Sequence, residues 1–70
     1  MKDIDFDSIG KKLKEIRTHK GFTQKFVAYS VKVNTSHISN IENGKVKISL
    51  TPLVNVCNVL GTTVDYVLKN

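Results

Sequence analysis

Apolar residues recur at intervals of three and four along most of this 70-residue chain, which is the spacing that places side chains on one face of an α-helix. The first stripe predicts a helix over about residues 8–19, and its members are Ile9, Leu13 and Ile16. We expect Asp7 or Ser8 to cap the start of this helix. Gly21 is expected to end it, because glycine adopts positive φ without steric cost.

Two further stripes lie within residues 23–44 and are separated by a short turn. Thr23 is expected to cap the first of these two helices, whose inner face carries Val27, Ala28 and Val31. The small side chain of Ala28 allows the two helix backbones to approach each other. Two short helices joined by a tight turn form a helix-turn-helix unit.

The second helix of this unit is predicted over about residues 35–42, with Gly44 as its stop. Asn34 is expected to cap its start by accepting hydrogen bonds from backbone N–H groups two or three residues on. Ile38 and Ile41 form its inner face. The side chains expected to point outward are Thr35, Ser36, His37 and Asn40. Such short hydrogen-bonding groups suit contacts with base edges in the major groove of DNA.

Two more helices are predicted downstream, so that the whole chain is expected to be all-α. Ser49 is expected to cap the first, Pro52 lies in its first turn, where a missing N–H is harmless, and Gly61 ends it. The second starts at Thr62 or Thr63. The expected core residues of the two helices are Leu50, Leu53, Val54, Cys57, Leu60, Val64, Val67 and Leu68.

The stretch TQKFVAYSVKVNTSHISNIENG, residues 23–44, resembles the Cro and lambda-repressor type of helix-turn-helix, known as the XRE family. The positions that follow the family pattern are Gln24, Ala28, Val33, Ile38, Glu42 and Gly44. Residues 49–68 resemble the family's last two helices through Leu50, Leu53, Val56, Leu60, Gly61 and Asp65. The resemblance implies a compact, lambda-repressor-like five-helix bundle that binds duplex DNA as a transcriptional regulator.

The resemblance also implies structural roles for individual residues. Arg17 falls where the family has an arginine that pairs with the glutamate at Glu42, and such a two-pronged pair would tie the first helix to the third. Gln24 matches a glutamine that contacts a phosphate and braces the helix end. Lys32 departs from the family, which usually has glycine in the turn; a left-handed conformation there costs a non-glycine residue about 1 to 3 kcal/mol. Either the turn geometry is adjusted or the core absorbs that strain.

We predict base contacts for Thr35, Ser36 and Asn40, with His37 next. The predicted phosphate contacts, which position a protein without specifying a sequence, are Gln24, Lys25, Asn43, Lys45 and Lys47. An ordinary solvated side chain is the alternative for His37 and for each of the lysines.

The charge of the chain supports this interpretation only modestly. Its net charge is +5, and residues 8–64 carry nine Lys or Arg against two Glu, a net of +7, whereas residues 1–7 carry −2. A basic domain points to nucleic acid because phosphate contacts supply sequence-independent affinity, although many basic domains bind nothing anionic. The length fits one small domain over residues 8–70, preceded by an N-terminal lead over residues 1–7.

Composition gives no sign of catalysis. His19, His37 and Cys57 lie on different predicted elements, and no glycine-rich phosphate loop or metal-ligand spacing is present, so we expect no enzyme, cofactor, metal or small-molecule ligand. Cys57 is expected to be a small buried hydrophobe, and a single cysteine allows no internal disulfide. No signal peptide or stretch of transmembrane length is found, which favours a soluble, cytoplasmic protein that does not associate with membranes.

Phe26 and Tyr29 occupy positions that are commonly polar in the family, and they lie three residues apart on one helix face. Either Ile4 or Phe6 of the lead covers them, which we favour, or they form a protein contact surface.

We expect a sequence-specific repressor that acts as a homodimer, because one helix contacts only a few base pairs, and two copies would bind half-sites about 34 Å apart. Val59 and Tyr66 are candidate dimer contacts, although isolated exposed apolar residues are normal. The alternative is a protein-interaction module, such as an antitoxin or antirepressor component, that keeps this fold and holds a partner through Phe26, Tyr29 and Tyr66.

Overall fold

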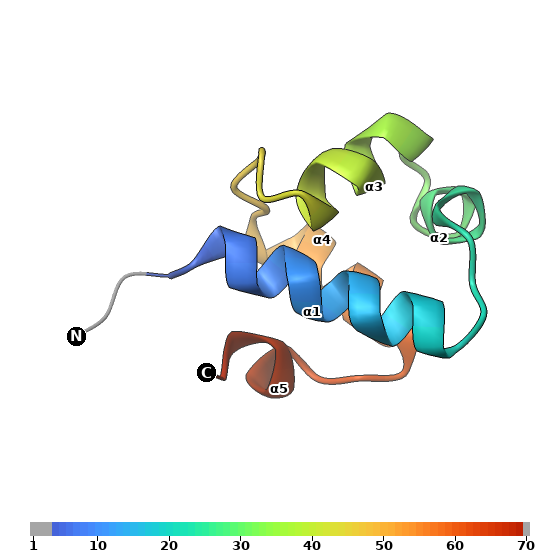
Figure 1. Ribbon diagram of the computed structural model, residues 1–70. Coiled ribbons are helices and arrows are strands. Elements are labelled where there is room, and N and C mark those ends of the chain that lie inside the picture. The colour runs from blue at the N-terminus through green and yellow to red at the C-terminus, as the bar shows by residue number, and fades with distance from the viewer. Residues whose placement is uncertain (1–3, 70) are drawn as a thin grey trace.

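The computed structural model describes residues 4–69, and its regular elements within that range are all helices. They are α1 (Phe6–His19), α2 (Gln24–Val31), α3 (Thr35–Glu42), α4 (Leu50–Leu60) and α5 (Val64–Leu68). In Figure 1, α1 crosses the middle of the molecule, with α2 and α3 above it and α5 below. Helix α4 packs against α2, α1 and α5. The predicted all-α, five-helix fold is confirmed.

The start of α1 differs from the prediction. The helix begins at Phe6, and its N-cap is Asp5 rather than Asp7 or Ser8. The Asp5 carboxylate accepts hydrogen bonds from the backbone N–H groups of Asp7 (3.1 Å) and Ser8 (3.2 Å). Phe6 extends the apolar stripe by one turn and packs against the core, which explains the earlier start. The predicted lead is therefore shorter than residues 1–7, and its first three residues lie outside the described range.

The core lies between all five helices, and its most deeply buried side chains are Leu13, Val27, Cys57, Leu60 and Val67. Each apolar stripe contributes to it at the spacing of three and four that the sequence shows. Phe22 and Val33, which flank α2, pack against its edge.

Three residues predicted in the core are exposed instead. Leu50, the first residue of α4, is 67% exposed, whereas Leu53 one turn further on is buried. Val54 and Leu68 each follow a buried residue directly, so they lie about 100° further round their helices and face solvent. Val56, which was not among the predicted core residues of α4, is buried.

The N-caps of α2 to α5 agree with the sequence in position but only partly in chemistry. Thr23 accepts a hydrogen bond from the N–H of Phe26 (3.0 Å), and Thr63 accepts one from Tyr66 (3.1 Å). Asn34 and Ser49 are the N-cap residues of α3 and α4, but neither side chain makes a capping hydrogen bond, contrary to the prediction for Asn34.

The turn between α2 and α3 keeps its left-handed geometry although glycine is absent. Lys32 has φ 61° and ψ 47°. Its N–H donates to the carbonyl of Tyr29 (3.2 Å), and the N–H of Val33 donates to the carbonyl of Ala28 (2.9 Å). This pair of hydrogen bonds is the Schellman arrangement, which normally has glycine in the left-handed position. The strain is thus retained in the turn rather than relieved by a change of geometry.

The strained turn gives a first prediction, for Lys32→Gly. Removing the Cβ relieves the left-handed strain, so we expect the free energy of unfolding to rise by about 1 kcal/mol, and the midpoint of thermal unfolding by about 4 to 8 °C. Circular dichroism during heating measures both. Lys32→Ala is the matched control, because it removes the ammonium but keeps the Cβ. A glycine variant no more stable than the alanine variant would contradict the strain.

Candidate nucleic-acid interface

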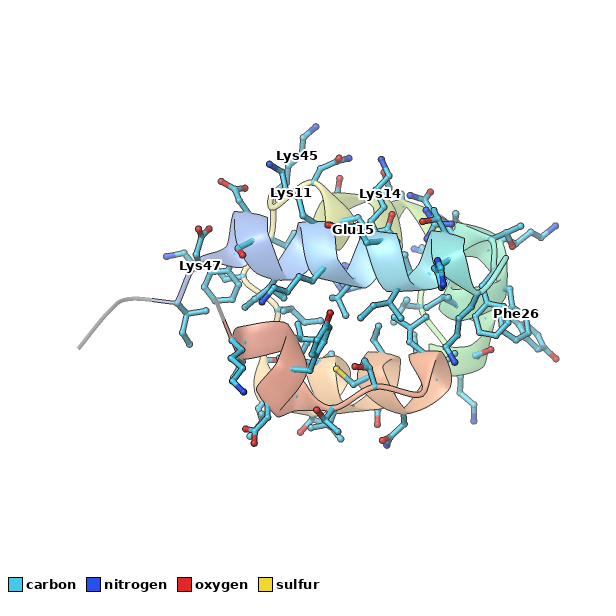
Figure 2. All side chains as sticks on the ribbon, turned by 60° about the horizontal axis from the view of Figure 1, so that its bottom comes forward. Lys11, Lys14, Glu15, Phe26, Lys45 and Lys47 are labelled. Carbon is cyan, nitrogen blue, oxygen red and sulfur yellow. The ribbon has the colours of Figure 1, made fainter. Side chains whose placement is uncertain are left out.

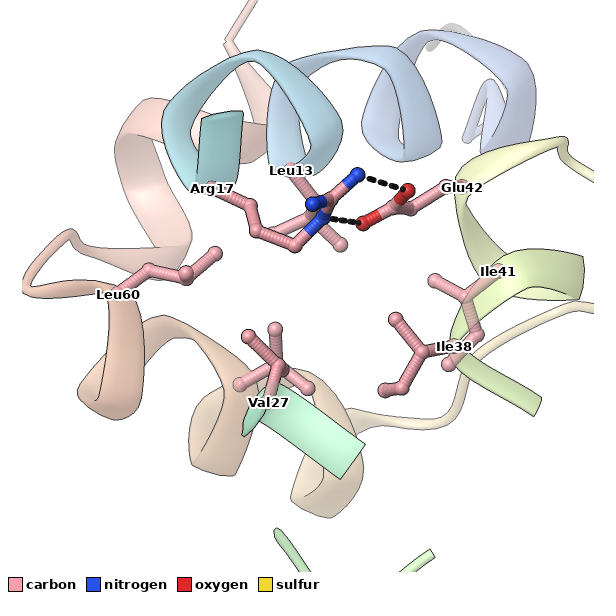
Figure 3. A pocket seen from close by; sticks show the side chains of 8 residues that line it. Leu13, Arg17, Val27, Ile38, Ile41, Glu42 and Leu60 are labelled. Atoms are coloured by element: carbon pink, nitrogen blue, oxygen red, sulfur yellow. Dashed lines mark hydrogen bonds and ion pairs between the residues drawn. The ribbon is translucent and has the colours of Figure 1, made fainter. Parts of the chain in front are cut away.

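A hydrogen-bonded network joins α1, α2 and α3 around one carboxylate. The Arg17 guanidinium donates to both oxygens of Glu42, through Nε to Oε2 at 2.6 Å and through Nη2 to Oε1 at 3.1 Å. The predicted pair is therefore present in its two-pronged form (Figure 3). Arg17 Nη1 also donates to the carbonyl of Phe22 (2.8 Å), and Gln24 Nε2 donates to Glu42 Oε1 (3.0 Å).

This network lies against the apolar core. Arg17 and Glu42 are 9% and 6% exposed, and they form the polar wall of a cavity of about 10 Å³ whose other walls are aliphatic. Figure 3 shows Leu13, Val27 and Leu60 around them. So small a space holds at most one water molecule, so the network serves structure rather than ligand binding. Among the described residues, no buried side-chain nitrogen or oxygen lacks a hydrogen-bond partner.

A second feature sets the distance between α1 and α3, and sequence reasoning missed it. A Cβ on Gly10 would overlap the backbone carbonyl oxygens of Ile41 and Glu42, so only glycine lets the two helices approach this closely. A glycine inside a predicted helix costs about 1 kcal/mol relative to alanine. That cost was the available signal, because it usually indicates close packing of another backbone.

The outer face of α3 carries the four predicted base contacts. Thr35 and Ser36 are exposed in its first turn, and Asn40 is half-buried one turn further on. None of these three side chains makes a hydrogen bond within residues 4–69, so their donors and acceptors are free for another molecule. His37 is half-buried and borders a groove of about 80 Å³ between α3 and α4, beside Pro52. His37 is therefore less exposed than Thr35 and Ser36.

The predicted phosphate contacts flank α3 at two places. Gln24 and Lys25 lie in the first turn of α2, and Lys25 is exposed. Asn43 caps the C-terminal end of α3, and Lys45 and Lys47 follow in the exposed loop before α4 (Figure 2). Gln24 uses one donor on Glu42, and its amide carries a second N–H.

The exposed aromatic residues of α2 are not covered by the lead, contrary to the interpretation favoured from sequence. Tyr29 is 83% exposed, and the Phe26 ring packs only partly on Phe22, with ring centroids 4.7 Å apart. Ile4 is exposed too, and α1 begins at the end of the molecule opposite α2 (Figure 1). Phe6 packs against the core at that far end.

The remaining candidates for chemistry do not converge on a site. Cys57 is buried, and this burial raises the pKa of its thiol, so the thiol stays protonated at neutral pH. Within residues 4–69, no group of three or more His, Cys, Asp or Glu side chains is placed to hold a metal ion. None of the helices in that range is long and apolar enough to cross a membrane.

Comparisons with known proteins agree with this geometry. The sequence matches a helix-turn-helix family over residues 13–67. It is 33% identical, over 60 residues, to the SPbeta prophage-derived uncharacterized HTH-type transcriptional regulator YonR of Bacillus subtilis (strain 168); the match spans 86% of this chain but only 56% of that relative.

Two solved structures are similar to the whole fold. The clp gene regulator ClgR from Corynebacterium glutamicum superposes with a TM-score of 0.89 at 29% identity, over 97% of this chain and 87% of that one. SinR, a master regulator for biofilm formation solved in complex with DNA, superposes with a TM-score of 0.79 at 32% identity, over 87% of this chain and 98% of that one.

The network around Glu42 gives the second prediction. Glu42→Gln keeps the shape of the side chain but leaves the buried Arg17 charge uncompensated, so we expect the free energy of unfolding to fall by about 3 to 5 kcal/mol. Gln24→Ala removes a single hydrogen bond to the carboxylate and should cost about 1.5 to 3 kcal/mol. Urea denaturation followed by circular dichroism measures both changes.

The combined variant Arg17→Met with Glu42→Leu checks the cause. Because it removes both charges together, it should be more stable than Glu42→Gln. A combined variant as unstable as the single one would show that the two charges do not act as a pair.

Proposed function

Because this chain belongs to the XRE-type helix-turn-helix family of DNA-binding transcriptional regulators, we propose that it is a sequence-specific repressor that binds operator DNA as a homodimer. The observation that carries the proposal is the outer face of α3, where unengaged hydroxyl and amide groups stand on a helix held rigidly by the Arg17 network. The similarity to SinR, which was solved in complex with DNA, supports DNA binding.

The base contacts that we propose come from Thr35, Ser36 and Asn40. Their side chains donate and accept hydrogen bonds and are short, so α3 must enter the major groove deeply for them to reach base edges. Thr35 and Ser36 lie at the N-terminal end of α3, which is the end that enters the groove in helix-turn-helix proteins. His37 lies on the side of α3 that faces α4. We therefore propose that it contacts a base or a phosphate at the edge of the DNA major groove.

The phosphate contacts that we propose lie at the two ends of the helix-turn-helix unit. At the start of α2, Gln24 offers its second amide N–H and Lys25 its ammonium. At the end of α3, Asn43, Lys45 and Lys47 offer an amide and two ammonium groups. Phosphate contacts at both ends would fix the depth and the register of α3 in the groove.

The proposed dimer uses the exposed part of α5. Tyr66 is 58% exposed and Leu68 is also exposed, so α5 presents an apolar surface. Val59, the other predicted contact, was expected to be exposed, but it is half-buried and packs against the core, so little of it is available to this surface. A dimer bound at a promoter represses by excluding other proteins from the same DNA.

The third prediction separates base contacts from phosphate contacts. Asn40→Ala should cost about 1 to 3 kcal/mol on a duplex selected from a random pool and relax preference at one base position. Lys45→Ala should weaken the selected and the random duplex alike and lower the salt slope by about one. Fluorescence anisotropy titrations at several salt concentrations measure both. Wild-type affinity in both variants would contradict these assignments, and no binding of the wild type to any duplex would contradict the function.

The fourth prediction concerns dimerisation. Tyr66→Ala should weaken self-association and lower affinity for a duplex with two half-sites about 34 Å apart, while binding to one half-site stays unchanged. Tyr29→Ala is the control, because Tyr29 is also an exposed tyrosine but lies on α2. Sedimentation velocity with and without DNA measures the assembly. If the two variants sediment alike, α5 is not the dimer surface.

A further inference from the structure

A surface groove lies between α1 and the C-terminal end of α3. Its volume is about 320 Å³, and it is bordered by Asp7, Lys11, Lys14, Glu42 and Asn43. Asp7, Lys11 and Lys14 follow one another at intervals of four and three, so they form one stripe along α1. Two ammonium groups, two carboxylates and one amide therefore surround a space that is open to solvent.

The charges around this groove leave it with a net positive charge, because two lysines face one carboxylate that is not already paired. The ammonium groups of Lys11 and Lys14 make no hydrogen bond or ion pair within residues 4–69. The Glu42 carboxylate is already engaged by Arg17 and Gln24. Asp7 is the only other acid that borders the groove, and its carboxylate lies against Gly44, where a Cβ would overlap it.

Two other lysines, Lys12 on α1 and Lys20 directly after it, have different surroundings. Lys12 donates to the carbonyl of Tyr66 (3.4 Å), and its ammonium lies 5.8 Å from the centre of the Tyr66 ring. Lys20 borders a separate groove, between α1 and α5, together with Glu15 and His19. Helix α1 thus directs Lys11 and Lys14 toward α3, and Lys12 and Lys20 toward α5.

The groove adjoins the phosphate contacts proposed at the end of α3. Asn43 borders it directly. Figure 2 shows Lys45 projecting from the same edge of the molecule as Lys11 and Lys14. A DNA strand whose phosphates pass Asn43 and Lys45 would therefore continue past the two lysines of α1.

We propose that Lys11 and Lys14 form, with Asn43, a phosphate-binding site that extends the DNA interface beyond the helix-turn-helix unit onto α1. This inference rests on the proposed DNA-binding function. Each lysine supplies a point charge to a backbone phosphate and releases a condensed counterion, so the site adds affinity that does not depend on base sequence. Asp7 opposes it, because its carboxylate repels the same phosphate.

Salt dependence tests the site. The wild type, Lys11→Gln, Lys14→Gln and the double variant are titrated by anisotropy against a fluorescent random-sequence duplex. Each single substitution should lower the slope of log affinity against log salt by about 0.9, and the double by about 1.8. The affinity deficit of the double variant should then shrink about tenfold between roughly 50 and 200 mM salt. Circular dichroism during heating checks that each variant is folded.

Two further variants control for net charge. Lys20→Gln removes one positive charge from the C-cap of the same helix, beside the groove on the α5 side, and should leave the slope unchanged. Asp7→Asn should raise the affinity severalfold, because it removes the opposing charge. Folded Lys11 and Lys14 variants that behave like Lys20→Gln would overturn the α1 site while leaving the proposed function intact. A wild type that binds no duplex would overturn both.

Discussion

The close approach of α1 and α3 is the constraint on which the rest of the structure depends. Gly10 brings the backbones of the two helices together, because any side chain there would meet the carbonyl oxygens at the end of α3. Seven residues later on α1, Arg17 reaches Glu42 with two hydrogen bonds. A buried ion pair gains little net stability, because removing both charges from water is costly. Its directional hydrogen bonds instead fix how α3 is oriented.

The contacts that orient α3 also stabilise it, because a helix this short would not be stable on its own. Helices shorter than about 12 residues are marginal in water, and α3 has eight residues and no side-chain cap from Asn34. Its shape therefore comes from the buried Ile38 and Ile41, and from Glu42 at its end. Gln24 donates to the same carboxylate, so a hydrogen bond ties the start of α2 to the end of α3. A surface organised in advance loses less entropy when it binds.

The sequence predicted the number and order of the helices because each apolar stripe has a clear period. The sequence did not predict burial or helix caps correctly where they depend on contacts with other parts of the fold. Leu50 has the right spacing to be in the core, but it is the first residue of α4 and lacks covering neighbours. Asp5 caps α1 because Phe6 packs against the core, which no local pattern encodes.

The ion pair between Arg17 and Glu42 was predictable only through the family resemblance, since 25 residues separate its partners. Likewise, periodicity places Lys11 and Lys14 on an exposed face, but only the packing of α1 beside Asn43 brings them to the end of α3.

The chemistry of α3 also limits how DNA affinity can arise. Thr35, Ser36 and Asn40 are uncharged, so the base contacts proposed for them contribute discrimination but no attraction at a distance. Attraction must then come from lysines outside α3, and those lie on α2, on the loop after α3 and on the near face of α1. Because these side chains are short, α3 must enter the DNA major groove deeply to reach the bases. Phosphate contacts at fixed positions around α3 would hold it at that depth. The close packing at Gly10 and the ion pair between Arg17 and Glu42 fix α1 against α3. They therefore also fix the positions of Lys11 and Lys14 relative to the helix that would enter the groove.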